Sequence, residues 1–199
     1  MRDFLLNTLK FILFVLFIPI IMAATHSFYK EFLNLEQLAE FFLYGMMAYL
    51  ILHHFIYVPQ GFYQFGQKIT SSIFRFSAFL AATLPALIPI FASLLLLGLL
   101  ITTQIFRIVH LKEYFFFFVG FTFLMHMILT AQTLYEEDTS VVKPHYFFMM
   151  SLSYTIGLII LALCIHINCH SFSFLNYLKR SCNLGKDLYV SVYHQLFIH

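Results

Sequence analysis

Residues 76–106 read FSAFLAATLPALIPIFASLLLLGLLITTQIF, a run of about thirty residues without Asp, Glu, Lys or Arg. The run is too long for one untilted membrane helix of ~20 residues and too short for two complete ones. Pro85 and Pro89 divide it, and each proline removes a backbone donor and disfavours helix at the residue before it. The sequence therefore predicts a kink, a broken helix or a re-entrant turn at residues 84–90.

Four further apolar segments flank this run, at residues 4–24, 38–58, 114–131 and 146–167. Each is near the length of a helix that spans a hydrocarbon core of about 30 Å. The chain is therefore predicted to be an all-α polytopic transmembrane protein, with about five membrane segments in a domain at residues 1–170. A cleaved signal peptide at residues 1–23 is the alternative for the first segment, but Ile21 and Met22 break the small-residue cleavage pattern, so we expect an uncleaved span.

The composition of the chain agrees with a lipid environment. Of 199 residues, 61% are hydrophobic and 10% are charged, against roughly 25% charged residues in soluble domains. So few charges cannot cover a water-soluble globule of this size, and the bilayer becomes the expected partner. The lysines and arginines form no basic run, which argues against nucleic-acid binding. Three cysteines make an odd number and favour free thiols over a disulfide framework.

Residues 171–199 have a different pattern and are predicted to form an amphipathic helix. Apolar or small residues recur at three- and four-residue steps, and polar residues fall between them. Two positions remain open for this helix: the membrane interface, with basic residues toward anionic headgroups, or the surface of the protein's own bundle. Gly185 is expected to loosen it midway. The apolar positions are Leu175, Leu178, Cys182, Gly185, Tyr189, Val192 and Leu196; the polar ones are Asn176, Lys179, Arg180, Asn183, Lys186 and Asp187.

The distribution of basic residues bears on orientation. Five crossings divide Lys and Arg five to six between the two faces, whereas an even number divides them nine to two, with only Lys30 and Lys143 opposite the rest. The positive-inside rule favours the second arrangement, with both termini in the cytoplasm. The Phe-rich spans and short loops favour a bacterial inner membrane.

The segment Phe65-Gly66-Gln67-Lys68-Ile69-Thr70-Ser71-Ser72-Ile73-Phe74 resembles the F-G-H-E-L-T-H-A-x-F form of the zinc-binding helix in site-2-type intramembrane metalloproteases. In that family two His bind zinc and the Glu between them activates water. The corresponding residues here are Gln67, Ser71 and Lys68, so the resemblance implies an inactive or repurposed relative. The alternative is a Gly-kinked polar connector.

Two other sets of residues are candidates for chemistry. His166, Cys169 and His170 would share one face of a helix and could bind zinc or copper, or could simply end the last span near the headgroups. His126 lies within a long apolar span, where an ionisable group is expensive and usually faces a partner or a cavity; an interhelical hydrogen bond is the competing interpretation. The acidic run at residues 136–138 is expected to be solvated.

These observations favour a non-enzymatic integral membrane protein, a scaffold or partner of other membrane proteins. Ala78, Ala82 and Ala86 recur at every fourth position, which suits close approach of another helix. A degenerate metalloprotease relative is the first alternative. A small transporter or channel-like protein, which would use His126 and the break at Pro85 and Pro89, is the second.

Overall fold

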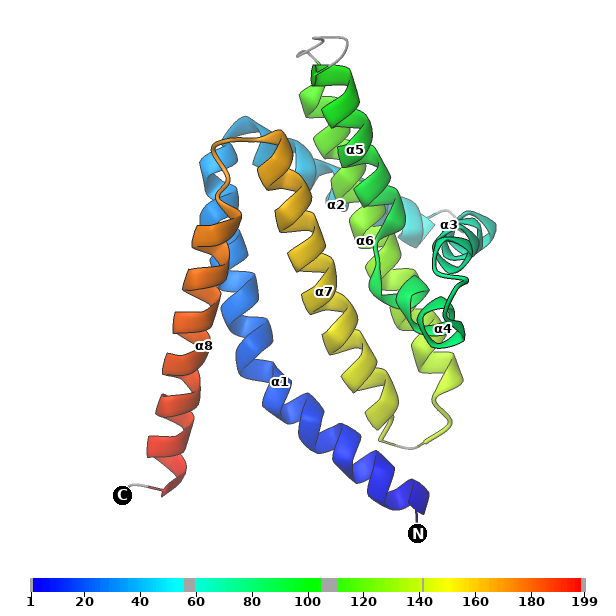
Figure 1. Ribbon diagram of the computed structural model, residues 1–199, viewed down its shortest axis with the longest axis vertical. Coiled ribbons are helices and arrows are strands. Elements are labelled where there is room, and N and C mark those ends of the chain that lie inside the picture. The colour runs from blue at the N-terminus through cyan, green and yellow to red at the C-terminus, as the bar shows by residue number, and fades with distance from the viewer. Residues whose placement is uncertain (1, 56–59, 105–110, 141, 198–199) are drawn as a thin grey trace.

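The fold is entirely helical in the residues described by the computed structural model, which are 2–55, 60–104, 111–140 and 142–197. This confirms the all-α polytopic prediction (Figure 1). Four helices, α1, α2, α6 and α7, are long and apolar enough to cross a membrane, and the bent pair α4 and α5 adds a fifth if it counts as one span. The helices are α1 Arg2–Phe32, α2 Gln37–Phe55, α3 Gln60–Ile73, α4 Ala78–Leu87, α5 Ile90–Gln104, α6 Lys112–Glu137, α7 Pro144–Asn168 and α8 Phe174–Phe197, with a 3-10 turn η1 Leu33–Leu35.

The long apolar run breaks where the prolines predict. Helix α4 ends at Leu87, α5 begins at Ile90, and their axes differ by 78°. The amide of Ile90 bonds to the Ile88 carbonyl (2.8 Å) and not to the carbonyl four residues back, which belongs to Ala86. The hydroxyl of Ser153 on α7 donates to that Ala86 carbonyl (2.6 Å). The break therefore exposes a backbone acceptor that a neighbouring helix satisfies.

Helix α6 is the centre of the bundle and packs against α2, α5 and α7. Glycines allow α2 to approach it closely. An ideal Cβ on Gly45 would lie 1.8 Å from the Phe117 carbonyl oxygen, and one on Gly120 would lie 2.0 Å from the Phe42 oxygen. Only residues without a side chain allow backbones to meet at this distance.

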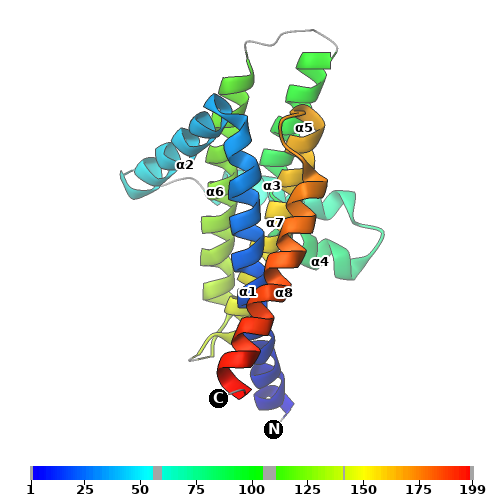
Figure 2. The ribbon, with the colours of Figure 1, turned by 90° about the vertical axis from the view of Figure 1, so that its left-hand side faces the viewer.

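Helices α1, α7 and α8 form a second group beside this centre (Figure 2). Helices α1 and α7 run in the same direction, as the ring contact of Phe14 with Phe147 (5.1 Å) and the hydroxyl contact of Thr25 with Tyr154 (3.0 Å) show. The chain then turns and α8 runs back along α1. Both termini therefore lie at the same end of the molecule (Figures 1 and 2).

The structure distinguishes between the two positions left open for the tail helix, because α8 docks on the protein's own bundle. Arg180 Nη1 lies 3.3 Å from Glu31 Oε1, and the Tyr189 hydroxyl donates to the Leu16 carbonyl. The buried face is centred on Tyr177 and Gly185, whereas Leu175 on the predicted apolar face is exposed. The expectation that Gly185 loosens the helix is wrong: α8 is continuous there, because Gly185 packs against Ala23.

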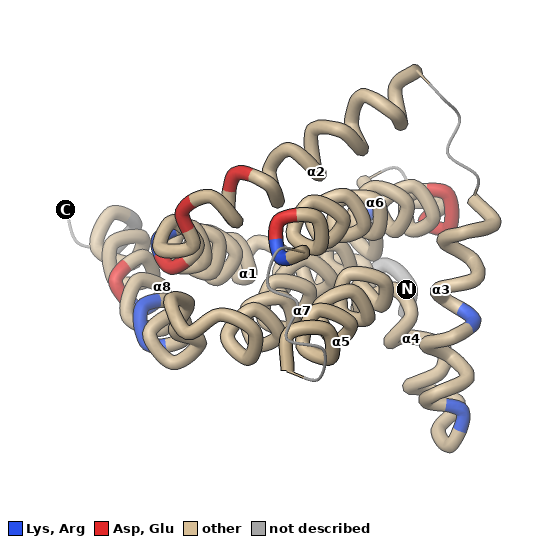
Figure 3. Tube along the Cα trace, turned by 90° about the horizontal axis from the view of Figure 1, so that it is seen from above, with Lys and Arg blue, Asp and Glu red and all other residues tan. Residues whose placement is uncertain are grey.

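The charge division of nine to two can be followed only in part, because Arg107 lies outside the described residues. Helix α6 runs opposite to α7, so Lys112 at its start lies at the same end as Lys30 at the close of α1. Lys10 and Lys143 lie toward the other end, where α1 and α7 begin. Viewed from above, the single basic residue of α3 and the basic residues of α8 lie at opposite edges of the molecule (Figure 3). The placement of both termini at one end therefore comes from the path of α8.

Candidate functional site

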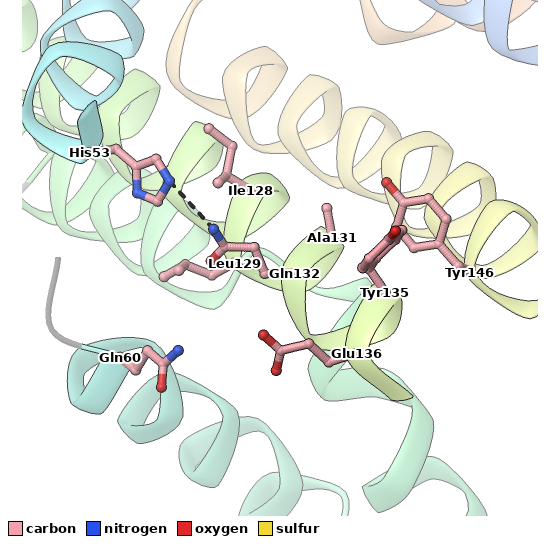
Figure 4. A pocket seen from close by; sticks show the side chains of 9 residues that line it. All are labelled: His53, Gln60, Ile128, Leu129, Ala131, Gln132, Tyr135, Glu136 and Tyr146. Carbon is pink, nitrogen blue, oxygen red and sulfur yellow. Dashed lines mark hydrogen bonds between the residues drawn. The ribbon is translucent and has the colours of Figure 1, made fainter. Parts of the chain in front are cut away.

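A large cavity lies between α2, α3, α6 and α7 and has a volume of about 710 Å³. The side chain of Glu136 on α6 and that of Gln60 on α3 point toward each other across it, and His53 projects from α2 (Figure 4). We call this cavity the cleft. Its lining is His53, Gln60, Ile128, Leu129, Ala131, Gln132, Tyr135, Glu136 and Tyr146. The cleft thus carries one carboxylate, one imidazole, two amides and two phenols.

Two smaller cavities lie near the cleft. One, of about 230 Å³, shares Gln60, Leu129, Gln132 and Glu136 with it and continues along α3. The other, of about 250 Å³, lies between α3, α4, α6 and α7; we call it the inner cavity, and it shares Tyr63, Gln67 and Thr133 with the first but no lining residue with the cleft. Its polar lining consists of Tyr63, Gln67, Thr83, Thr130, Thr133, Glu137 and His145. None of the residues that line these cavities, all within the described ranges, is lysine or arginine.

Hydrogen bonds order the polar side chains around these cavities. The Gln67 amide donates to the Tyr63 hydroxyl, which lies 2.8 Å from the Thr130 hydroxyl on α6. The Gln132 amide donates to His53 Nε2 (3.5 Å) at the wall of the cleft. Burial raises the pKa of Tyr63, so its hydroxyl stays protonated and can both donate and accept.

His126 lies near the middle of α6, about 17 Å along the helix from its C-terminal end. Its side chain is only 6% exposed, and its ring centre lies 6.1 Å from that of Tyr63. Together with Tyr63, Gln67 and Pro85 it lines a small cavity of about 10 Å³ at the α4–α5 break. The sequence-based expectation that His126 faces a partner or a cavity agrees with this geometry.

The loop from α6 to α7 forms one end of the cleft and is tightly bonded. Burial tends to raise the pKa of Asp138, but donors from the Ser140 side chain and from the Tyr146 and Ser140 backbones outweigh it and lower the pKa to about 2. Lys143 Nζ lies 3.8 Å from the centre of the Tyr135 ring and donates to the Tyr135 carbonyl (2.8 Å). Asp138 is therefore a structural anchor of the loop and not part of a solvated acidic run.

The structure does not bring the predicted metal ligands onto one helix face. Helix α7 ends at Asn168, so His166 lies on the helix, while Cys169 and His170 lie in the turn that follows. His166 Nδ1 bonds to the Phe172 carbonyl (2.8 Å), Cys169 is buried and His170 is exposed. In the described part of the chain no three His, Cys, Asp or Glu side chains are grouped as metal ligands.

Residues 65–73 of the segment compared with intramembrane metalloproteases lie on helix α3. Gln67 and Gly66 face the interior, whereas Lys68 is exposed and accepts a bond from Ser71 through its carbonyl (3.1 Å). The helix is amphipathic and is not among the candidate spans.

Sequence reasoning singled out His126, which lines the small cavity at the α4–α5 break, but it did not find the cleft. Gln60, Tyr63 and Gln132 carry no recognisable motif, and they come from elements separated by up to seventy residues. The signal that could have found them is the cluster of amide side chains at residues 60–67 beside otherwise apolar segments. Comparison of the chain with protein-family models, curated proteins and solved structures found no match in any of the three.

Proposed function

We propose that the protein is a small transporter or channel-like membrane protein that admits a polar solute to the cleft. One observation carries this proposal: polar side chains line a series of adjoining cavities from Glu136 to His126, at the point where the α4–α5 segment is broken. Irregular backbone at membrane depth is tolerated where it is buried in protein or lines a wet cavity. Discontinuous helices with polar residues near the midplane are typical of transport sites.

The proposed solute is small and cationic. The carboxylates of Glu136 and Glu137 line the cleft and the inner cavity, and neither lining includes lysine or arginine. A cleft whose charges have one sign attracts solutes of the other sign. The phenol rings of Tyr135 and Tyr146 add surfaces that favour a cation, as the Lys143 ammonium over Tyr135 illustrates within the protein.

Thiol labelling tests whether water and solutes reach this path. Thr130, one helical turn from His126, is 0% exposed but lines the inner cavity, whereas Thr122, on the same helix and 8% exposed, lines none of these cavities. In a protein whose three native cysteines are replaced, we expect Thr130→Cys to react with a membrane-impermeant cationic methanethiosulfonate measurably faster than Thr122→Cys, because only the first faces a cavity that water can enter. Equal, slow reaction of both variants would refute the proposal.

We further propose that the protein lies in a bacterial inner membrane with both termini in the cytoplasm, so that the cleft opens to the cytoplasm. The support for this orientation is that both termini and the α6–α7 loop lie at one end of the molecule (Figure 1). Reporters fused to the N- and C-terminus should both read cytoplasmic. A non-cytoplasmic reading at either end contradicts this orientation.

A scaffold that contacts other membrane proteins is the second candidate function. Ala78 and Ala82 are exposed on α4, where another helix could approach closely. This function predicts that Ala78→Leu and Ala82→Leu abolish co-purification of a partner without altering the labelling of Thr130→Cys. The metalloprotease relationship stays a prediction. So does binding of zinc or copper at His166, Cys169 and His170, which metal analysis beside the triple alanine variant would test.

A further inference from the structure

The backbone break between α4 and α5 provides an unusual acceptor beside His126. The Ala86 carbonyl has lost the helical donor of Ile90 and instead accepts from Ser153. His126 also interacts electrostatically with the Ala86 backbone. Its ring nitrogen Nε2 is buried and has no hydrogen-bond partner among the described residues.

Nε2 of His126 is therefore the exceptional atom. It is buried, and an unpartnered buried polar atom carries a substantial free-energy cost. The residue lines the small cavity at the break, whose volume of about 10 Å³ is close to that of one water molecule. A position of this kind is arranged to receive a proton donor.

A route connects this nitrogen with the cleft. Tyr63 and Gln67 line both the small cavity and the inner cavity, and their side chains are hydrogen-bonded to each other and to Thr130. His145, at the far side of the inner cavity, also has a buried ring nitrogen, Nδ1, without a partner among the described residues. His126 and His145 thus each have an unpartnered ring nitrogen, and the cavities that they line share the side chains of Tyr63 and Gln67.

We propose that His126 is a proton-binding site that receives its proton from the cleft through Tyr63 and Gln67. This inference rests on the proposed function and makes the transporter proton-linked. A hydronium ion from water in the cleft gives its proton to Nε2 of the neutral imidazole, which leaves water and an imidazolium. The new positive charge then lies at the α4–α5 break, where it repels a cationic solute.

The groups that surround His126 make its charge measurable. Tyr63 faces it from α3, and the lining from α4 and α5 is uncharged. Farther away, Glu137 on α6 and His145 on α7 line the inner cavity. The test compares the rates at which Thr130→Cys reacts with anionic and cationic methanethiosulfonates between about pH 8 and pH 3, a range that extends well below the ordinary histidine pKa because burial disfavours a charged imidazolium. The ratio of the two rates cancels the ionisation of the thiol itself.

We expect the anionic-to-cationic ratio to rise on acidification by about sevenfold, the effect of a unit charge about 7 Å away even at the dielectric constant of water. The rise should vanish when His126→Asn is added to Thr130→Cys. It should persist when His145→Asn or Glu137→Gln is added instead. A rise lost only in the His145 or Glu137 variant assigns the charge to that residue and overturns the proposal.

The outcomes separate the two proposals. If Thr130→Cys reacts with neither reagent, the proposed function itself fails. If it reacts but the ratio is constant over the pH range in which the protein stays folded, the path is wet and the proton site is refuted. This second result needs no His126 variant, so it holds even if His126→Asn does not fold.

Discussion

The close approach of α2 to α6 gives a sharp prediction for Gly45→Ala. An alanine Cβ at position 45 would lie 1.8 Å from the Phe117 carbonyl oxygen, against 3.4 Å or more for ordinary contact. Both partners belong to helix backbones, so neither can rotate away. The two helices must therefore separate by about 1.5 Å, close to the difference between these two distances.

The expected loss of stability combines three contributions. Overpacking of this kind costs about 1–3 kcal/mol, and loss of the Cα–H···O contact adds about 0.5–1 kcal/mol. Alanine returns about 1 kcal/mol through its higher helix propensity. The net effect is a loss of about 2 kcal/mol, which lowers the Tm of a domain of this size by about 4–8 °C.

Thermal unfolding of the purified protein in one detergent checks this value. Gly61→Ala is the matched control, because no atom of the described residues lies within 4 Å of the place that its new methyl group would take, and only the helix-propensity gain should appear. Gly120→Ala should behave like Gly45→Ala, and the double variant should lose less than the sum, since the helices separate only once. A Tm for Gly45→Ala at or above that of Gly61→Ala would refute the close helix contact.

Three further predictions concern single polar contacts. Since the folded-state pKa of Asp138 is depressed to about 2, its stabilising contribution is present above about pH 4. The Tm advantage of the wild type over Asp138→Ala should therefore shrink as pH falls from about 4 toward 2, and an advantage independent of pH would contradict this. Arg180→Gln leaves the buried Glu31 carboxylate without its cation. The free energy that holds α8 on the bundle should fall by about 1 kcal/mol or less, because Arg180 is half exposed, and α8 should become more sensitive to protease. Adding Glu31→Gln to Arg180→Gln should restore resistance. Ser153→Ala removes a donor at the α4–α5 break and should cost about 1 kcal/mol, whereas Ser151→Ala, whose hydroxyl bonds within its own helix, should leave the Tm nearly unchanged.

The membrane segments could be predicted because one physical requirement fixes them. A span must be apolar over about twenty residues, and each of the predicted segments is. The break between α4 and α5 could be predicted equally well, because Pro89 has no amide proton and no rearrangement of side chains can supply one. The helix ends were less predictable: α1 extends to Phe32, because Ser27 and Glu31 are buried against other elements and not against lipid.

The cleft and the position of α8 could not be predicted because both depend on contacts between distant elements. Periodicity placed Gly185 correctly on the buried face of α8, but it also placed Leu175 there and missed Tyr177, which packs with Gly185 against the bundle. The cleft combines Gln60 from α3 with Glu136 from α6, and neither residue is unusual in its own segment. Only the packing of α2, α3 and α7 around α6 makes them neighbours.

The α4–α5 break joins features that the sequence presents separately. In the sequence, His126 suits an interhelical bond or a cavity, and the prolines suit a kink. In the structure the break deprives the Ala86 carbonyl of its helical donor, Ser153 satisfies that carbonyl, and His126 interacts with the same backbone. The unpartnered nitrogen of His126 belongs to a residue that lines the small cavity at the break. A backbone irregularity that a polar side chain of α7 stabilises thereby lies beside the imidazole that is proposed to receive a proton, so the structural and the proposed functional requirements meet at one point of the fold.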